Sequence, residues 1–367
     1  MAVESRSRGS VGGGDVRRRS RRRSLLATVV SLAAVAAGTF TVAMASPAGA
    51  VPSSPTGCGT MRAEGDQSIT VDGATVSIYL PKGDHKGKLP LVLDLHGSGT
   101  TGEQTLNSDG IRAVADRQGF AVAAPNGAVP FAPAPGFSGF AWNIPGVPLV
   151  GTTIYPPAGT RDDVQFVSHV IDGMQATTCV DAKRVYATGV SGGGRMASQL
   201  ACDLSDRIAA IAPVSGVRFP QASDNPGTSV TCAPGRAVPV IAIHGVWDPV
   251  NVFAATPPPE AASLPAKINP PVPGSSWSYS AQEAVLRWTL FDRCTGPTRV
   301  TSETPNIDRI TYTGCRGGSE VQLYKVKNSG HALPGHGNPA LDFLLNPTNN
   351  EVDGTQVAWD FLSRFRL

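Results

Sequence analysis

The stretch YATGVSGGGRMA, residues 186–197, decides which fold the sequence predicts. An apolar run leads into it, and helical periodicity follows it, so we predict a strand, a tight turn and a helix in that order. Ser191 stands in the turn within the pattern G-x-S-x-G. Glycines on both sides permit unusual backbone angles and leave space beside the serine. This context favours an exposed nucleophile at Ser191 over a flexible glycine loop.

Strands and helices alternate on both sides of this turn. An Asp-Gly turn predicts an opening hairpin over residues 68–81. Further predicted strands are 89–97, 120–127, 184–190, 208–216, 238–245 and 319–326, and predicted helices are 111–119, 161–174, 193–204, 280–291 and 354–365. Apolar strands alternating with helices predict a mostly parallel sheet with helices on both faces. We expect one α/β domain over residues 51–367, with long proline-rich loops at about 128–160 and 252–278.

The first 50 residues have the order of a secretory signal peptide. Two arginine triplets within residues 17–23 precede an apolar stretch at 25–45, and small residues follow at 46–50. The sequence RRSLL at 22–26 also fits a twin-arginine signal loosely, and a membrane anchor is the alternative. We therefore expect a secreted, extracellular protein that leaves the membrane after signal cleavage.

Composition narrows the function classes. The chain is 41% hydrophobic and 16% charged, which suits a folded domain with a large core. The net charge is +3, but eight arginines and two acidic residues among the first 50 residues leave the remainder at −3. We therefore expect no nucleic-acid partner.

Six cysteines in an exported chain favour disulfides. The predicted pairs are Cys294–Cys315, Cys202–Cys232 and, by elimination, Cys58–Cys179. No Cys or His spacing suggests zinc, so we expect no metal and no cofactor.

A nucleophilic serine needs a histidine as its base. Three histidines follow Ser191 in the chain. His331, in KNSGHALPG, comes just after the last predicted strand, where the base belongs. His336 is its rival, whereas His244 ends an apolar strand and suits a structural role.

The base needs an acid to orient it, and we predict Asp248 in the stretch IAIHGVWDPVN. It follows a predicted strand end, although an Asp-Pro turn is the structural alternative. Asp292 and Asp308 are weaker candidates, since one lies within a helix and the other in the presumed disulfide loop. Asp162 and Asp163 precede the serine and suit a helix start.

An oxyanion hole needs two backbone amides. Gly192 supplies one, and the stretch LHGSGTTG at 95–102 supplies the other, through Ser98 first and Gly99 next. In the loop at 128–146, Phe140 and Trp142 are the predicted substrate contacts of an apolar acyl pocket. The alternative is that these aromatic side chains anchor the loop to the core.

Taken together, the motifs LHGSG, DDVQFV, DAKRVYATGVSGGGRMA, LSDRIAAIAPVSG, IHGVWDP, GHALPG and VAWDF resemble a known family. It is that of secreted polyhydroxybutyrate depolymerase-type esterases and the related feruloyl and acetylxylan esterases of carbohydrate esterase family one. The resemblance covers nearly all of residues 58–367 and implies an α/β-hydrolase fold with Ser191, Asp248 and His331 as the triad and no metal. Gly192, where relatives often carry Asn or Ala, and GVWDP in place of GTxDP depart from the pattern.

We therefore expect a secreted serine carboxylic-ester hydrolase that acts through an acyl-enzyme. Its favoured substrates are feruloyl or acetyl esters of plant cell-wall polysaccharide, and we expect a monomer. The alternatives are an extracellular polyhydroxybutyrate or polyhydroxyalkanoate depolymerase, a peptidase, and a non-enzymatic secreted binding protein on a hydrolase scaffold. The last predicted helix reaches the end of the sequence given, which disfavours a separate polymer-binding module.

Overall fold

A ten-stranded sheet is the framework of the computed structural model, which describes residues 64–133, 136–219, 232–255 and 280–367. The strand order is β1-β2-β4-β3-β7-β8-β9-β12-β11-β10. The strands are β1 (Gly65–Val71), β2 (Ala74–Leu80), β3 (Leu89–Leu95), β4 (Ala121–Ala124), β7 (Val180–Val190), β8 (Ala210–Val214), β9 (Val240–Gly245), β10 (Arg299–Thr304), β11 (Ile307–Tyr312) and β12 (Val321–Val326). The strands from β4 to β12 in this order are parallel, and an antiparallel pair extends the sheet on each side.

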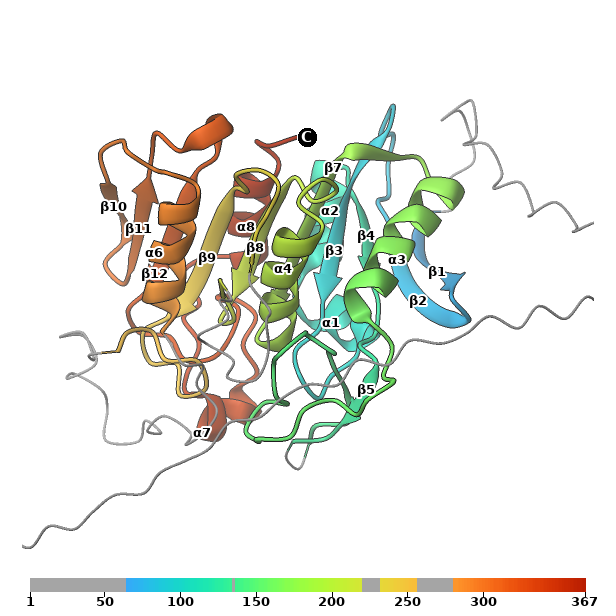
Figure 1. Cartoon of the computed structure of the whole chain (residues 1–367), viewed down its shortest axis with the longest axis horizontal. Helices are drawn as coiled ribbons and strands as arrows, with labels where there is room; N and C mark the ends of the chain where they lie inside the picture. The colour runs from blue at the N-terminus through green and yellow to red at the C-terminus, as the bar shows by residue number, and fades with distance from the viewer. Residues whose placement is uncertain (1–63, 134–135, 220–231, 256–279) are drawn as a thin grey trace, which may run out of the picture. The chain divides into compact units, whose positions relative to one another are not determined.

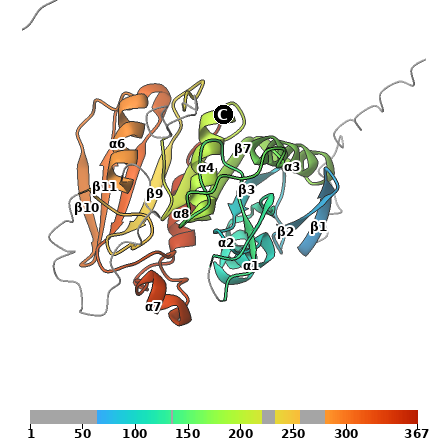
Figure 2. The same cartoon turned by 60° about the horizontal axis from the view of Figure 1, so that its bottom comes forward.

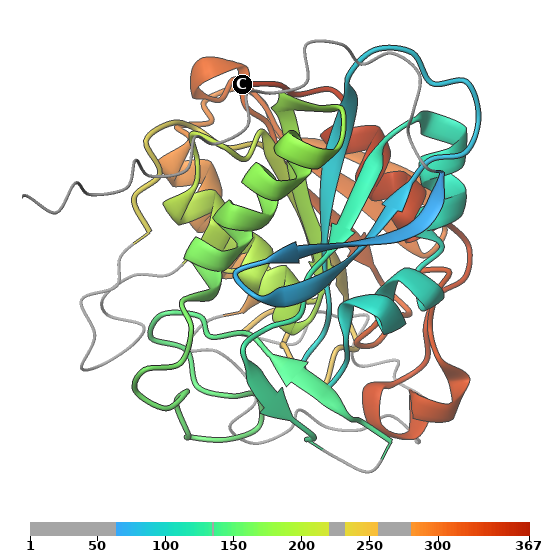
Figure 3. The ribbon, with the colours of Figure 1, turned by 90° about the vertical axis from the view of Figure 1, so that its right-hand side faces the viewer.

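Helices cover both faces of the sheet (Figure 1). The helices are α1 (Gly102–Ser108), α2 (Ile111–Gln118), α3 (Asp163–Thr177), α4 (Gly192–Asp203), α6 (Ala281–Phe291) and α8 (Gly354–Leu362). Figure 3 shows α3 and α4 on one side of the sheet and α1, α2 and α8 on the other. The predicted fold class, a mostly parallel α/β sheet with helices on both faces, is confirmed.

Side-chain alternation along β3 explains the two layers. The strand is buried along its whole length, which its apolar sequence predicts. Leu91, Leu93 and Leu95 pack into the core beneath α3, α4 and α6. Val92 points the other way, into the core beneath α2 and α8. One continuous apolar strand therefore supplies both cores.

The predicted loop between Cys294 and Cys315 is instead a β-hairpin. Its strands β10 and β11 pair antiparallel and continue the sheet beyond β12. The sequence signal was missed because β10 is an edge strand whose side chains are almost all exposed, so no apolar alternation marks it. The predicted Cys294–Cys315 disulfide closes this hairpin, and the predicted Cys202–Cys232 disulfide is also present. Cys58, and with it the predicted Cys58–Cys179 pair, lies outside the described residues.

The two predicted long loops differ in how far they are described. The loop at 128–160 is described apart from residues 134–135 and contains a small antiparallel pair, β5 (Val129–Phe131) and β6 (Gly139–Ala141). Of the loop at 252–278, only residues 252–255 are described. β5 and the short helix α7 (Asp342–Leu345) lie at the edge to which the parallel strands point (Figures 1 and 2).

None of the helices in the described ranges has the length and apolar character needed to span a bilayer.

Candidate active site

Ser191 occupies a strained turn between β7 and α4. Its backbone has φ 57° and ψ −115°, a combination that residues with a side chain rarely adopt. The Ser191 amide donates to the Val214 carbonyl (2.9 Å), and the Ser191 carbonyl accepts from the Arg195 amide (3.0 Å). The predicted strand–turn–helix is therefore present, and hydrogen bonds to β8 and α4 hold the serine backbone in place.

The surrounding glycines are required because the turn packs tightly against the end of β3. A Cβ atom at position 189 or 193 would collide with the Leu95 carbonyl oxygen. A Cβ at position 192 would lie 2.5 Å from the Ser98 hydroxyl and 3.1 Å from the Ser98 amide nitrogen. Ser98 thus fills the space that a side chain at position 192 would need, which accounts for a glycine at this position.

His331 and Asp248 form a buried pair. The Nδ1 atom of His331 lies 2.9 Å and 2.8 Å from the two carboxylate oxygens of Asp248. Burial raises the pKa of Asp248, but the charge of His331 and hydrogen bonds from His331 and His244 outweigh it and hold this pKa well below its usual range. The carboxylate is therefore ionised at neutral pH and binds the Nδ1–H of His331, which leaves Nε2 to act as a base.

Ser191 and His331 both line one cavity of the protein. Between these two described residues the structure has no hydrogen bond, and the Ser191 hydroxyl has no partner elsewhere in the described ranges. Such contacts are often long in a free enzyme and shorten when substrate binds. The geometry therefore brings the nucleophile candidate and the base candidate to one cavity without a direct bond.

The rival base and acids have other partners in the fold, although His336 also lines the cavity that Ser191 and His331 share. His336 Nε2 lies 3.0 Å from Asp353, which caps α8. Asp292 is buried, accepts from the Ser319 hydroxyl, and has a pKa that burial raises to about 6. Of the other candidates, Asp308 pairs with Lys327, Asp162 caps α3, and Asp163 pairs with Arg161. Among the described residues, no cluster of His, Cys, Asp or Glu could hold a metal.

Two amides suit the predicted oxyanion hole. Gly192 is the first residue of α4, so its amide has no acceptor within the helix. The Ser98 amide has no acceptor among the residues that the structure describes, whereas the Gly99 amide donates to the Phe140 carbonyl (2.8 Å). Gly99 is thus occupied, and Ser98 remains the better of the two predicted donors.

His96 anchors the loop that carries Ser98, a role that sequence reasoning missed. Its Nε2 accepts from the Gly127 amide (2.9 Å), so Nδ1 carries the proton and donates to the Gly97 carbonyl (2.8 Å). Burial lowers the pKa of His96 to about 4, so the ring is neutral near pH 7. The only sequence signal was His96-Gly97 at a strand end, which fits a plain strand ending equally well.

Trp142 and Phe140, the predicted substrate contacts, are bound to the segment that carries Ser98. Trp142 is 4% exposed, donates from its indole N–H to the His96 carbonyl (2.8 Å) and stacks on the His96 ring. The Phe140 amide donates to the Thr100 carbonyl (2.9 Å), and the Phe140 carbonyl accepts from the Gly99 amide (2.8 Å). Neither residue is among those that line the cavity next to Ser191, so the cavity does not support the prediction that they contact substrate. They fasten the loop to the segment that carries Ser98, which is the alternative stated for these aromatic residues.

Other residues of the same loop line the cavity, which has a volume of about 590 Å³. Its apolar wall comprises Phe131, Pro133, Phe137, Leu341, Leu344 and Leu345. Ser98, Ser191 and His331 lie on its remaining wall. The alternation of loop side chains between cavity and core could not be read from the sequence because this irregular loop has no regular periodicity.

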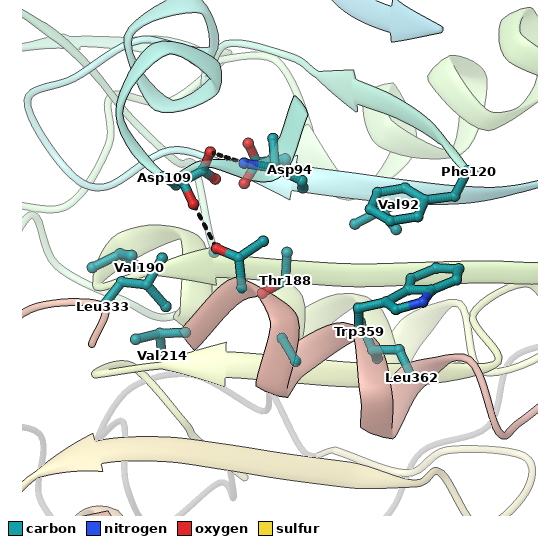
Figure 4. Close-up of a pocket in the computed structure, with 14 residues that line it drawn as sticks. Val92, Asp94, Asp109, Phe120, Thr188, Val190, Val214, Leu333, Trp359 and Leu362 are labelled. Atoms are coloured by element: carbon teal, nitrogen blue, oxygen red, sulfur yellow. Dashed lines mark hydrogen bonds between the residues drawn. The ribbon is translucent and has the colours of Figure 1, made fainter. Parts of the chain in front are cut away.

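A second, much smaller cavity lies among the buried side chains that α8 covers (Figure 4). It has a volume of about 20 Å³, and Figure 4 shows Asp94 and Asp109 side by side on its wall. Burial and the neighbouring Asp109 carboxylate raise the pKa of Asp94 well above its usual range. The cavity is too small for an ester substrate, since it approaches the size of one water molecule.

No protein-family model matches the sequence. Feruloyl esterase B from Piromyces equi is 28% identical over 235 residues, which are 64% of this chain and 35% of that protein. NocK from Nocardia uniformis subsp. tsuyamanensis, provisionally named as an esterase, is 28% identical over 276 residues, which are 74% of each chain. The bifunctional acetylxylan esterase/xylanase XynS20E from Neocallimastix patriciarum is 29% identical over 302 residues, or 80% of this chain and 34% of that protein.

The alignment thus spans 35% of the feruloyl esterase and 34% of the bifunctional enzyme, but most of this chain. The relatives are named for ester hydrolysis, and the sheet with its strand–turn–serine–helix has the α/β-hydrolase arrangement. The chain is similar in sequence to feruloyl and acetylxylan esterases, and its fold is that of an α/β-hydrolase.

Proposed function

We propose that this protein is a serine carboxylic-ester hydrolase with Ser191 as nucleophile, His331 as base and Asp248 as the orienting acid. The observation that carries this proposal is that His331, which is paired with the buried Asp248, lines the cavity that Ser191 also lines. The strained backbone of Ser191 supports it, because strain of this kind concentrates at functional sites.

The reaction then follows in two steps. The Ser191 hydroxyl attacks the ester carbonyl while His331 Nε2 accepts its proton, and Asp248 stabilises the resulting imidazolium. The amides of Gly192 and Ser98 bind the oxyanion. The alcohol leaves with the proton from His331, and a water molecule deprotonated by His331 then hydrolyses the acyl-enzyme.

Feruloyl or acetyl esters carried by plant cell-wall polysaccharide are the substrates we favour. Their support is the similarity to proteins named feruloyl esterase and acetylxylan esterase. The cavity favours the feruloyl ester, because an acetyl group leaves most of about 590 Å³ unfilled, whereas an aromatic acyl group can cover the apolar wall. The arginine-rich, apolar N-terminal segment and the two disulfides within the described residues support export of the protein.

The decisive experiment replaces the proposed nucleophile. Ser191→Ala should lower hydrolysis of methyl ferulate by roughly 10⁶-fold, because no other group supplies the acyl acceptor. Ser198→Ala is the matched control, since this serine lies in α4, the helix that follows Ser191, and donates to the Gly194 carbonyl (2.9 Å). Comparable activity of the Ser191→Ala variant and the wild type would overturn the assignment.

A substrate panel separates the proposed substrates from the alternatives. Methyl ferulate, acetylated xylan, 3-hydroxybutyrate oligomers and a peptide anilide are assayed side by side. We expect the highest kcat/KM for methyl ferulate. Preferred cleavage of the 3-hydroxybutyrate oligomers would indicate a depolymerase, and preferred cleavage of the anilide a peptidase. A non-enzymatic binding protein would cleave none and would not be labelled at Ser191 by a fluorophosphonate.

A further inference from the structure

Asn251 lies three residues after Asp248 and is only 3% exposed. Its amide donates to Asp248 Oδ1 (2.8 Å), and its carbonyl accepts from His244 Nε2 (2.7 Å). Its side-chain Oδ1 accepts from the guanidinium of Arg195, and its Nδ2 donates to the Ser215 carbonyl. Each backbone and side-chain polar group of Asn251 is therefore engaged with a different residue.

The side-chain bonds of Asn251 join the acid loop to the element that carries the nucleophile. Arg195 lies one turn after Ser191 in α4. Ser215 follows β8 in the strained left-handed region, with φ 47°, and is completely buried. This conformation directs the Ser215 carbonyl to Asn251 Nδ2. A strained residue persists only where its surroundings hold it, and Asn251 is part of that support.

The backbone bonds of Asn251 act on the carboxylate itself. Asp248 Oδ1 accepts from the amides of Val250 and Asn251, both at 2.8 Å. His244 Nε2 faces two acceptors, the Asn251 carbonyl and Asp248 Oδ2 at 3.3 Å, so this nitrogen carries a proton. The buried His244 ring therefore contacts Asp248 Oδ2, the same oxygen that lies 2.8 Å from His331 Nδ1.

We propose that Asn251 is a positioning residue that holds Asp248 in line with His331. It does so by tying the acid loop to α4 and to the end of β8, so that the acid and the nucleophile keep a fixed relative position. The inference rests on the proposed function, in which Asp248 orients the base. Loss of the side-chain bonds releases the loop while every group of the triad remains present.

The test compares Asn251→Ala with the wild type. We expect kcat for methyl ferulate to fall about 10- to 100-fold with KM little changed, since a small misplacement of the acid affects the transition state more than binding. We also expect the far-downfield proton resonance of the Nδ1–H bonded to Asp248 to weaken or disappear. If the alanine variant does not fold, Asn251→Ser replaces it in the same measurements, because the shorter serine side chain also loses the bonds to Arg195 and Ser215.

Gln322→Ala is the matched control, because it also removes a buried amide, but near the start of β12. It should lower the melting temperature without changing kcat or the downfield resonance. An Asn251→Ala variant with the kcat and resonance of this control would overturn the inference while leaving the proposed function intact. If the wild type hydrolyses no ester, the proposed function fails, and the resonance alone decides whether Asn251 positions Asp248.

Discussion

Two of the five described non-glycine residues with positive φ lie at the candidate site. Ser191 and Ser215 both have positive φ, and both are held by hydrogen bonds to the ends of neighbouring strands. A non-glycine residue in such a region costs on the order of 1–3 kcal/mol, so each position must be fixed by its surroundings. At Ser191 this places the hydroxyl at the end of β7, and at Ser215 it directs a carbonyl to Asn251.

A single buried residue, the neutral His96, makes the stability of the protein depend on pH. Burial lowers the pKa of His96 from 6.5 to about 4. Between these values the unfolded chain binds a proton that the folded protein does not. The contribution of His96 to stability is therefore complete above pH 6.5 and is lost as the pH falls toward 4, with a total of roughly 3 kcal/mol.

Urea unfolding at pH 7 and pH 5 checks this prediction. The wild type should lose about 2 kcal/mol through His96 over this interval. His96→Gln removes the titrating group, so its loss should be smaller by that amount, although the variant is less stable at pH 7. His169→Gln is the control, because His169 is an exposed residue paired with Asp72 on the surface. Equal pH dependence in the wild type and the His96→Gln variant would refute the assignment of this loss to His96.

At the scale of elements, the parallel strands carry the site and the antiparallel pairs extend the sheet away from it. Ser191, Asp248 and His331 follow β7, β9 and β12, whose carboxyl ends meet at one edge because the strands are parallel. The hairpin β10–β11 adds two strands beyond β12, and the Cys294–Cys315 disulfide joins the residues that flank it. Stability of this hairpin and chemistry at Ser191 should therefore be separable.

Removing that disulfide tests the separation. The double variant Cys294→Ser, Cys315→Ser should have a free energy of unfolding lower by about 3 kcal/mol, because the unfolded chain regains the entropy of a loop of this size. Its kcat on methyl ferulate should match the wild type, and urea unfolding with parallel assays measures both quantities. The double variant Cys202→Ser, Cys232→Ser provides a comparison, because Cys202 lies in α4, the helix that begins directly after Ser191. A large loss of kcat in the hairpin variant would contradict the prediction.

At the level of the whole domain, distant parts of the chain build the cavity next to Ser191. Most of its lining comes from the segment from Gly97 through α1, the loop containing Phe131 and Phe137, and the segment from His331 to Leu345, and Ser191 and Val250 also line it. Trp142 and His96 fasten the second of these to the first through a stack with ring centres 4.7 Å apart. The cavity proposed to hold the acyl group is thus a product of loop packing rather than of a single motif.

Two variants in the loop at 128–146 should have different effects on substrate preference. Phe137→Ala removes part of the apolar wall and should lower kcat/KM for methyl ferulate by about 10- to 100-fold, in keeping with the loss of a buried aromatic contact. Its kcat/KM for p-nitrophenyl acetate should change far less, because an acetyl group does not reach that wall. Phe140→Ala, in the same loop but off the cavity, should leave the ratio of the two values unchanged. The same ratio in both variants would exclude Phe137 as a specificity determinant.

The parallel strands, most of the helices that cover them and the turn that carries Ser191 could be predicted from the sequence alone. These features depend on apolar periodicity and on glycine at fixed offsets, which are local properties of the chain. The sequence order also named Asp248 and His331, whose catalytic roles remain predictions.

The three-dimensional packing was needed to show which histidine pairs with Asp248, which amide near Ser98 is unoccupied, and which aromatic side chains face the cavity. His331 lies 83 residues from Asp248 in the chain, and Trp142 lies 46 from His96, so neither contact has a local signal. The edge hairpin was missed for a related reason, since its exposed strands bury too little apolar surface to leave a pattern. Contacts between distant segments follow from how the loops pack on the sheet, and packing depends on the whole chain at once.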